Sequence, residues 1–192
     1  YTTLFRSDGM EMAGKQLKPW FGPGGDRTLA QQLQGLDVLR ARVPGCSVLD
    51  VGCAEGAISL QLCDDGAAAV HGIEIRPDFV DAANKARGDR AALFEVANAE
   101  TYTPKRPYDF VLMLAVLHKL ADPSAAAARL AAAAQQIVVV RLPPEHAPKI
   151  RDARSGFKPH NVEKVLRASG FRALHVTKGA FDEWTGYFIR DV

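Results

Sequence analysis

The chain has 192 residues, of which 47% are hydrophobic, and this is enough for one domain with a single apolar core. Its 24 Lys and Arg nearly balance its 22 Asp and Glu, and a net charge of +2 is too small to indicate a nucleic-acid or membrane partner. The spacing of Cys46, Cys53 and Cys63 fits neither a disulfide framework nor a zinc site. We therefore expect a reducing compartment and no bound metal.

The hydropathy of the chain shows no apolar run near the roughly eighteen residues that a membrane helix needs. We expect a cytoplasmic protein that does not enter membranes. Residues 1–7 resemble translated adapter sequence rather than a natural N-terminus. We expect residues 1–25 to form an N-terminal extension and residues 26–192 to form one domain.

Helix and strand signals alternate along the chain. Asp26 is placed to cap a helix that ends near Pro44, with apolar positions at helical spacing. After it the sequence predicts, in order, strand 47–51, helix 56–63, strand 68–75, helix 77–88, strand 93–97, strand 108–114, helix 122–135, strand 137–141, helix 161–170 capped by Asn161, and strands 173–177 and 185–190.

The predicted strands are mostly continuous apolar runs, which is typical of a parallel sheet covered by helices on both faces. The last two strands have no helix between them. They therefore predict an antiparallel hairpin at one edge of an otherwise parallel α/β sheet.

The segment from Val48 to Ala57 carries the strongest chemical signal. An apolar strand contains Asp50, and the chain then turns through Gly52 and Gly56 into a helix. A glycine turn allows close approach of a ligand to the backbone, and a helix N-terminus favours negatively charged groups. An acidic residue, Glu74, ends the next strand, as in folds that bind nucleotide cofactors. This pattern indicates a cofactor site at the carboxyl edge of the sheet.

The stretch Asp50-Val-Gly-Cys-Ala-Glu-Gly56 resembles the E/D-x-G-x-G-x-G signature of class I S-adenosylmethionine-dependent methyltransferases. The likeness extends from about Thr28 to the C-terminus. It implies a Rossmann-like, doubly wound, mostly parallel seven-stranded sheet, S-adenosyl-L-methionine as cofactor, and methyl transfer as the activity. Ala54 departs from the signature, since it replaces the central glycine.

The resemblance also implies roles for individual residues. Asp50 would orient the methionine amino group, Glu74 would bind both ribose hydroxyls, and Asn98 would read the adenine edge in place of the commoner Asp. The expected cofactor contacts are Asp50, Gly52, Cys53, Ala54, Gly56, Glu74, Ile75, Asn98, Ala99, Leu114 and Ala115.

Three other polar residues invite a functional interpretation. His118 follows a strand in a segment that resembles the family's V-L-H motif, so it is either a general base or a histidine hydrogen-bonded within its loop. Asp109 stands at the entry of the same strand, opposite the ligand edge, and we expect it to be structural. Arg27 either neutralises the cofactor's carboxylate or pairs with surface acids.

Two further groups lie near the expected crevice. Arg141, Glu145 and His146 follow the fifth strand, where they would contact substrate or form a solvated loop. Trp20 and Phe21 precede the first helix, where they would cover the cofactor or pack on the core.

The acceptor is expected to be a small molecule, because the chain has little insertion with which to recognise a polymer. An RNA methyltransferase stays open, since basic residues outnumber acidic ones after Arg141. A cofactor-binding partner subunit without catalysis is also open. A nicotinamide dehydrogenase is disfavoured, because Ala54 and Ala57 occupy glycine positions of the G-x-G-x-x-G pattern.

Overall fold

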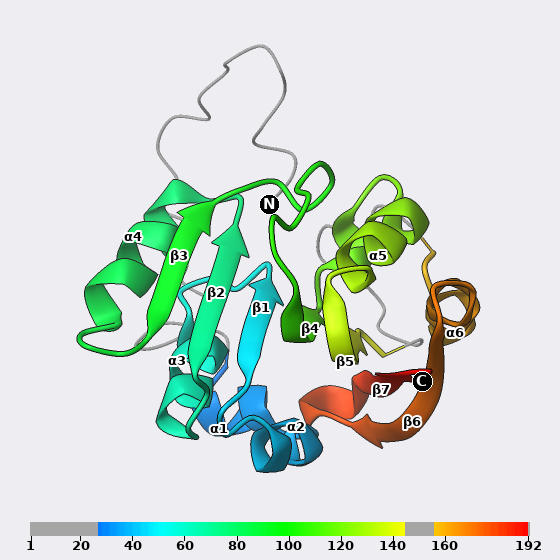
Figure 1. The fold of residues 1–192 in the computed structure, drawn as a ribbon, viewed down its shortest axis with the longest axis horizontal. Helices are drawn as coiled ribbons and strands as arrows, with labels where there is room; N and C mark the ends of the chain where they lie inside the picture. Colours follow the sequence, from blue (N-terminus) through cyan, green and yellow to red (C-terminus); the bar gives the residue numbers. More distant parts are fainter. Residues whose placement is uncertain (1–26, 145–155, 192) are drawn as a thin grey trace.

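The computed structural model describes residues 27–144 and 156–191 (Figure 1). Six helices and seven strands follow one another along this part of the chain. The helices are α1 Leu29–Leu33, α2 Asp37–Arg42, α3 Ala57–Asp64, α4 Pro77–Ala86, α5 Pro123–Ala131 and α6 Pro159–Ala168. The strands are β1 Ser47–Val51, β2 Ala69–Glu74, β3 Ala92–Val96, β4 Tyr108–Leu114, β5 Ala134–Leu142, β6 Phe171–Lys178 and β7 Trp184–Arg190. None of the described helices has the length and apolar character needed to cross a membrane.

The strands form one sheet in the order β3-β2-β1-β4-β5-β7-β6. Strands β1 to β5 pair in parallel, whereas β7 is antiparallel to both β5 and β6. The predicted α/β fold with a C-terminal antiparallel hairpin is therefore confirmed. Strand β7 lies between β5 and β6. Because β7 runs antiparallel to β5, its N-terminal end lies at the same edge of the sheet as the carboxyl ends of the parallel strands.

Helices cover both faces of the sheet because alternate strand residues point to opposite sides. On one face Leu49, Val111 and Val138 pack with residues of α5 and α6. On the other face Val48 and Leu112 pack with residues of α2 and α3. Figure 1 shows α4 beside β3, where the two elements share a smaller apolar cluster.

The predicted helix after residue 26 is two short helices, α1 and α2. Gly35 separates them in a left-handed conformation with φ of 75°, and a Cβ atom there would lie 2.9 Å from the backbone oxygen of Lys178. Thr28 caps α1, because its Oγ1 accepts from the amide of Gln31 at 3.2 Å and Gln31 Oε1 accepts from the amide of Thr28 at 2.9 Å. The expected cap, Asp26, lies outside the described residues.

Two other predicted boundaries shift. Helix α5 ends at Ala131 instead of continuing to residue 135, because Ala134 already pairs with Tyr108 in the sheet. Sheet pairing thus overrides the helix propensity of the alanine run. Asn161 lies inside α6 rather than before it, and its Oδ1 accepts from the amide of Lys158 at 2.9 Å.

Candidate functional site

A pocket of about 400 Å³ runs along the carboxyl edge of the sheet. Its volume is in the range of small-molecule sites. The ends of β1, β2, β4 and β5 line it, together with the segment before β7. Every residue expected to contact the cofactor lies on its wall except Gly56. The wall comprises Arg27, Gln32, Asp50, Gly52, Cys53, Ala54, Glu55, Ala57, Ile58, Ile73, Glu74, Ile75, Phe79, Ala97, Asn98, Ala99, Leu114, Ala115, Val116, His118, Lys119, Leu120, Arg141, Pro143, Pro144, Phe181 and Glu183.

The glycine turn after β1 forms one wall of this pocket. Gly52 has φ of 75°, and a Cβ atom there would lie 3.1 Å from Val116 Cγ2. Ala54 also adopts a left-handed conformation, with φ of 48°, although it carries a side chain. Its amide donates to Glu74 Oε2 at 3.1 Å. The departure from the family signature at Ala54 is therefore accommodated by a backbone held from β2.

Gly56 has a packing role behind this turn. It is the N-cap of α3 with φ of 77°, and an added Cβ would lie 2.9 Å from Phe94 Cζ and 3.0 Å from Ala83 Cβ. A side chain would separate α3 from β3 and α4. Gly56 does not line the pocket, and the close approach between elements accounts for a glycine here; its contact with the cofactor stays a prediction.

Glu74 joins the ends of β1 and β2. Its Oε1 accepts from the amides of Ile75 and Arg76 at 2.8 and 3.1 Å, and its Oε2 accepts from Ala54 at 3.1 Å. A carboxylate has about four acceptor positions. Glu74 thus shapes the turn and keeps limited capacity for a ligand hydroxyl.

Asp50 lies beneath the same turn and is only 3% exposed. Burial raises the pKa of its carboxyl to about 6, opposed by the hydrogen bond from Ser59 and reinforced by the negative charge of Glu74. The Ser59 hydroxyl donates to Asp50 Oδ2 at 2.6 Å. A cationic group of a ligand near this carboxyl would favour its ionised form.

The loop after β3 is held from α5. Asn98 is exposed at the pocket, and its Oδ1 accepts from the amide of Glu100 at 2.9 Å. Arg129 donates through Nε to the Tyr102 carbonyl at 2.9 Å and through Nη2 to the carbonyls of Ala99 and Glu100, each at 2.8 Å. The guanidinium therefore fixes the backbone next to Asn98. This contact could not be predicted from the sequence, because Arg129 lies on a helix distant along the chain.

His118 lies in a short 3₁₀ helix, Leu117–Lys119, just after β4. Its side chain lines the pocket and the residue is 4% exposed. Ala115 precedes this turn with φ of 56°, and its amide donates to the Arg141 carbonyl at 3.0 Å. The histidine is thus in the expected place, while its role as a base stays a prediction.

Arg141 belongs to β5 and not to a solvated loop. It is 1% exposed, and burial lowers its pKa, opposed mainly by the charge of Glu183. Its Nε donates to Thr185 Oγ1 at 3.1 Å, and its Nη1 and Nη2 donate to the carbonyls of Gln32 and Gln34 at 2.8 and 2.6 Å. These bonds explain why the charged Arg141 side chain can be buried, and they join β5 to the end of α1 and to the residue that follows it.

Arg27 pairs with a buried acid instead of a surface acid. Its Nη1 donates to Glu183 Oε1 at 2.7 Å, and its guanidinium lies 5.2 Å from the centre of the Phe181 ring. Sequence reasoning missed Glu183 and Phe181. One feature of the sequence could have indicated them. The last strand was predicted to be antiparallel, so it begins at the edge where the parallel strands end, and the residues just before it lie at the ligand edge. The expected residues Glu145, His146, Trp20 and Phe21 lie outside the described residues.

Asp109 has the structural role that we expected. Its Oδ2 accepts from the Ser47 amide and hydroxyl, both at 2.8 Å, and its Oδ1 accepts from Gln136 Nε2 at 2.7 Å. The bonds from Ser47 lower the pKa of Asp109. They join the starts of β1, β4 and β5 at the edge opposite the pocket.

A family model described as a methyltransferase domain matches residues 48–137. This stretch runs from β1 into β5 and contains the glycine turn, Glu74 and the loop at Asn98. The match covers slightly less than half of the chain, and this part of the protein is similar to methyltransferase domains. This similarity and the seven-stranded fold agree with the resemblance of the glycine-turn sequence to class I methyltransferases.

One curated relative and two solved structures illustrate the similarity. The ribosomal protein L11 methyltransferase of Methylococcus capsulatus is 38% identical over 108 residues, which cover 54% of this chain and 33% of that protein. The magnesium protoporphyrin IX methyltransferase of Synechocystis, solved with S-adenosylhomocysteine, has a TM-score of 0.72 and 22% identity, over 85% of this chain and 84% of that one. The cyclase SpnF has a TM-score of 0.68 and 18% identity, over 84% and 81% of the two chains.

This chain spans about a third of the length of the curated relative. The structural likenesses concern the fold, and the same fold carries a cyclase as well as methyltransferases.

Proposed function

We propose that this protein binds S-adenosylmethionine and transfers its methyl group to a small molecule that enters the same pocket. The observation that carries the proposal is the placement of two carboxyl groups, Asp50 and Glu74, on either side of a glycine turn in a family-matched domain. The solved relative with bound S-adenosylhomocysteine supports the choice of cofactor.

The residues present fit this cofactor. The left-handed turn at Gly52 exposes backbone at the pocket, and Asp50 offers a carboxyl to a cationic amino group. Glu74 is suited to a ribose hydroxyl. Its carboxylate already accepts three hydrogen bonds from backbone amides, so it can accept fewer bonds from a ligand than a carboxylate without partners could. Asn98 offers an amide to the adenine edge.

Bound at this edge, the cofactor supplies an activated methyl group on a sulfonium. The protein then mainly has to hold the acceptor in line with that methyl group and exclude water. His118, buried on the pocket wall, would take the proton of an acceptor that must lose one.

The pocket volume of about 400 Å³ is in the range of small-molecule sites, which favours a small acceptor over a polymer. The curated relative is named for a ribosomal protein and the solved relative for a porphyrin. Neither acceptor follows for this chain, because this chain spans about a third of the curated relative and the likeness to the solved structure concerns the fold.

Isothermal titration calorimetry with S-adenosylhomocysteine and NAD tests the cofactor. We expect binding of S-adenosylhomocysteine, and Glu74→Ala should weaken it at least tenfold, since a charge-assisted hydrogen bond contributes about 1.5 to 3 kcal/mol. Tighter binding of NAD would refute the proposal. An unchanged affinity in the variant, within twofold, would remove Glu74 from the ribose site.

Methyl transfer itself is tested by incubating the protein with a labelled methyl donor and a panel of small acceptors. A labelled product that depends on Asp50 and Glu74 supports catalysis. Tight cofactor binding with transfer only to RNA, or only after a partner protein is added, would favour the two alternative functions.

A further inference from the structure

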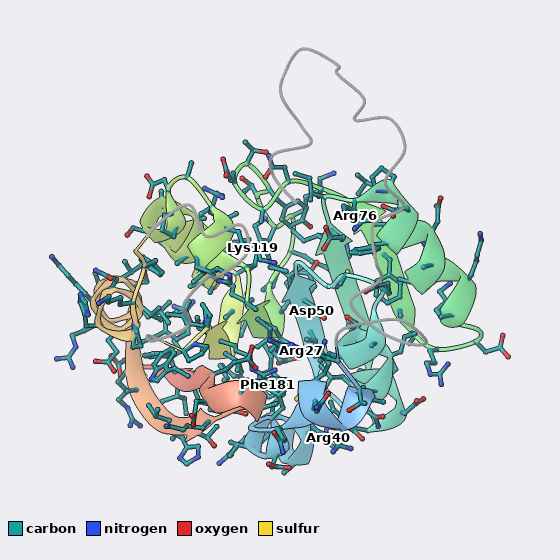
Figure 2. All side chains as sticks on the ribbon, turned by 180° about the vertical axis from the view of Figure 1, so that it is seen from behind. Arg27, Arg40, Asp50, Arg76, Lys119 and Phe181 are labelled. Carbon is teal, nitrogen blue, oxygen red and sulfur yellow. The ribbon has the colours of Figure 1, made fainter. Side chains whose placement is uncertain are left out.

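The end of the pocket beyond β5 has no part in the contacts assigned to the cofactor's nucleoside. Arg27, Phe181 and Glu183 line it. Arg27 comes just before α1, whereas Phe181 and Glu183 lie between β6 and β7. Figure 2 shows Arg27 next to Phe181, with Asp50 on the other side of Arg27. Two segments that are far apart in the sequence therefore build this end together.

The Arg27 guanidinium is held on two sides. Its Nη1 donates to Glu183 Oε1 at 2.7 Å, and the Phe181 ring centre lies 5.2 Å away. The Glu183 side chain is only 2% exposed, so it offers Arg27 a fixed acceptor. A guanidinium has five N–H donors, and this bond uses one of them. The Arg27 side chain is 21% exposed, so the remaining donors are accessible to a ligand.

The charges around Arg27 favour an anion. Glu183 Oε2 also lies 4.0 Å from Arg141 Nε, so one carboxylate serves two guanidiniums. These three side chains together carry one excess positive charge. Asp50 and Glu74 lie on the part of the wall formed by β1 and β2. We refer to the part of the wall formed by Arg27, Arg141 and Glu183 as the basic end of the pocket.

The loop that carries Phe181 is strained. Phe181 and Asp182 have φ of 62° and 60°, a region that costs a residue with a side chain about 1 to 3 kcal/mol. The loop is closed by a hydrogen bond from the Gly179 amide to the Glu183 carbonyl at 2.8 Å. It leaves the Phe181 ring 58% exposed at the pocket, over Arg27. Strain of this kind is typical of functional loops, and here it presents an aromatic face beside a cation.

We propose that Arg27, fixed by Glu183 and Phe181, binds a carboxylate inside the pocket. The inference deepens the proposed function and rests on it. The carboxylate belongs either to the methionine part of the cofactor or to the methyl acceptor. A planar guanidinium recognises both in the same way, through paired N–H donors.

Calorimetry of Arg27→Gln with three probes separates the two sources. S-adenosylhomocysteine carries the cofactor's carboxylate, 5′-methylthioadenosine lacks it, and benzoate is a free aromatic carboxylate. We expect the variant to weaken binding of S-adenosylhomocysteine about tenfold or more if the cofactor is the source, and of benzoate if the acceptor is the source. Binding of 5′-methylthioadenosine should stay within twofold, and Arg27→Lys should recover part of the loss.

Arg40→Gln is the matched control. Arg40 makes a bidentate pair with Asp65, at 2.6 and 2.9 Å, away from the pocket wall. This control loses an arginine ion pair without touching a ligand, so its affinities should equal those of the wild type.

Three results would overturn the role of Arg27. The variant binds both carboxylate probes as the wild type does, or it loses 5′-methylthioadenosine as strongly as S-adenosylhomocysteine, or the wild type binds neither carboxylate probe. Failure of the wild type to bind either adenosine compound contradicts the proposed cofactor. In that case, benzoate binding to the protein alone still decides the role of Arg27.

Discussion

Asp50 combines deep burial with an ionisable carboxyl whose pKa is raised to about 6. In the unfolded chain this carboxyl loses its proton near pH 4. Between these values the folded protein holds a proton that the unfolded chain has lost, so Asp50 makes the free energy of unfolding decrease as pH rises from about 4 to 6. Its burial therefore costs stability at neutral pH, as expected for a group kept for a ligand.

A bound amino group should favour the ionised form of Asp50 over the protonated form. We expect the affinity for S-adenosylhomocysteine to increase about tenfold from pH 5 to pH 7, because only ionised Asp50 attracts the cation. Asp50→Asn should show weaker binding with little pH dependence. Calorimetry at a series of pH values checks this, and an equally steep dependence in the variant would show that Asp50 is not its source.

His118 can be tested once an acceptor is known. If its imidazole takes the acceptor's proton, His118→Ala should lower turnover about a hundredfold or more and leave cofactor affinity nearly unchanged. The wild-type rate should rise with pH as the imidazole loses its own proton.

A purely structural histidine would give a different pattern. The variant would then be less stable in urea, with nearly normal turnover for each folded molecule and an unchanged pH profile. Measuring unfolding and kinetics on the same preparation separates the two roles.

At the scale of elements, α5 supports the cofactor site through Arg129. Three hydrogen bonds from this guanidinium fix the carbonyls of Ala99, Glu100 and Tyr102. Arg129→Gln should loosen the loop that carries Asn98 and weaken binding of adenosine-containing ligands about five- to tenfold, since several bonds to a charged donor are lost.

Calorimetry with 5′-methylthioadenosine measures this effect, because that ligand consists mainly of the part near Asn98. Arg167→Gln is the control, since Arg167 is exposed on α6. Equal affinities in the two variants would show that the loop keeps its shape without Arg129.

At the scale of the whole molecule, the segment between α1 and α2 joins the two ends of the described chain. The Gly35 carbonyl accepts from the Tyr187 hydroxyl at 2.6 Å, and Arg141 donates to the carbonyls of Gln32 and Gln34, which precede it. The left-handed backbone at Gly35 lies directly against Lys178.

Gly35→Ala and Gly45→Ala form a matched pair for stability. Both glycines have nearly the same φ, 75° and 76°, but an added Cβ meets the Lys178 carbonyl at Gly35 and nothing within 4 Å at Gly45. We expect Gly45→Ala to cost about 1 kcal/mol from strain, and Gly35→Ala to cost roughly 1 to 3 kcal/mol more from overlap. Urea unfolding measures both. Equal losses would mean that the Lys178 loop moves away freely.

Local patterns in the sequence determined much of this fold. Strands β1 and β4 have the predicted bounds. Each is an apolar run bounded by turn residues, and this local pattern indicates a buried strand whatever its position in the sheet. The glycine turn and Glu74 could also be predicted to meet, since parallel strands end at one edge. Asn98 and His118 followed for the same reason.

Only the tertiary structure decided the basic end of the pocket. Arg27 and Glu183 are separated by 156 positions, and they meet because β7 inserts beside β5 with its start at the ligand edge. The break at Gly35 likewise depends on Lys178, a residue from the far end of the chain. Periodicity reports the environment of neighbouring residues. It does not show which distant segments contribute the two partners of a buried ion pair such as Arg27 and Glu183. The order of the strands in the folded sheet brings those partners together.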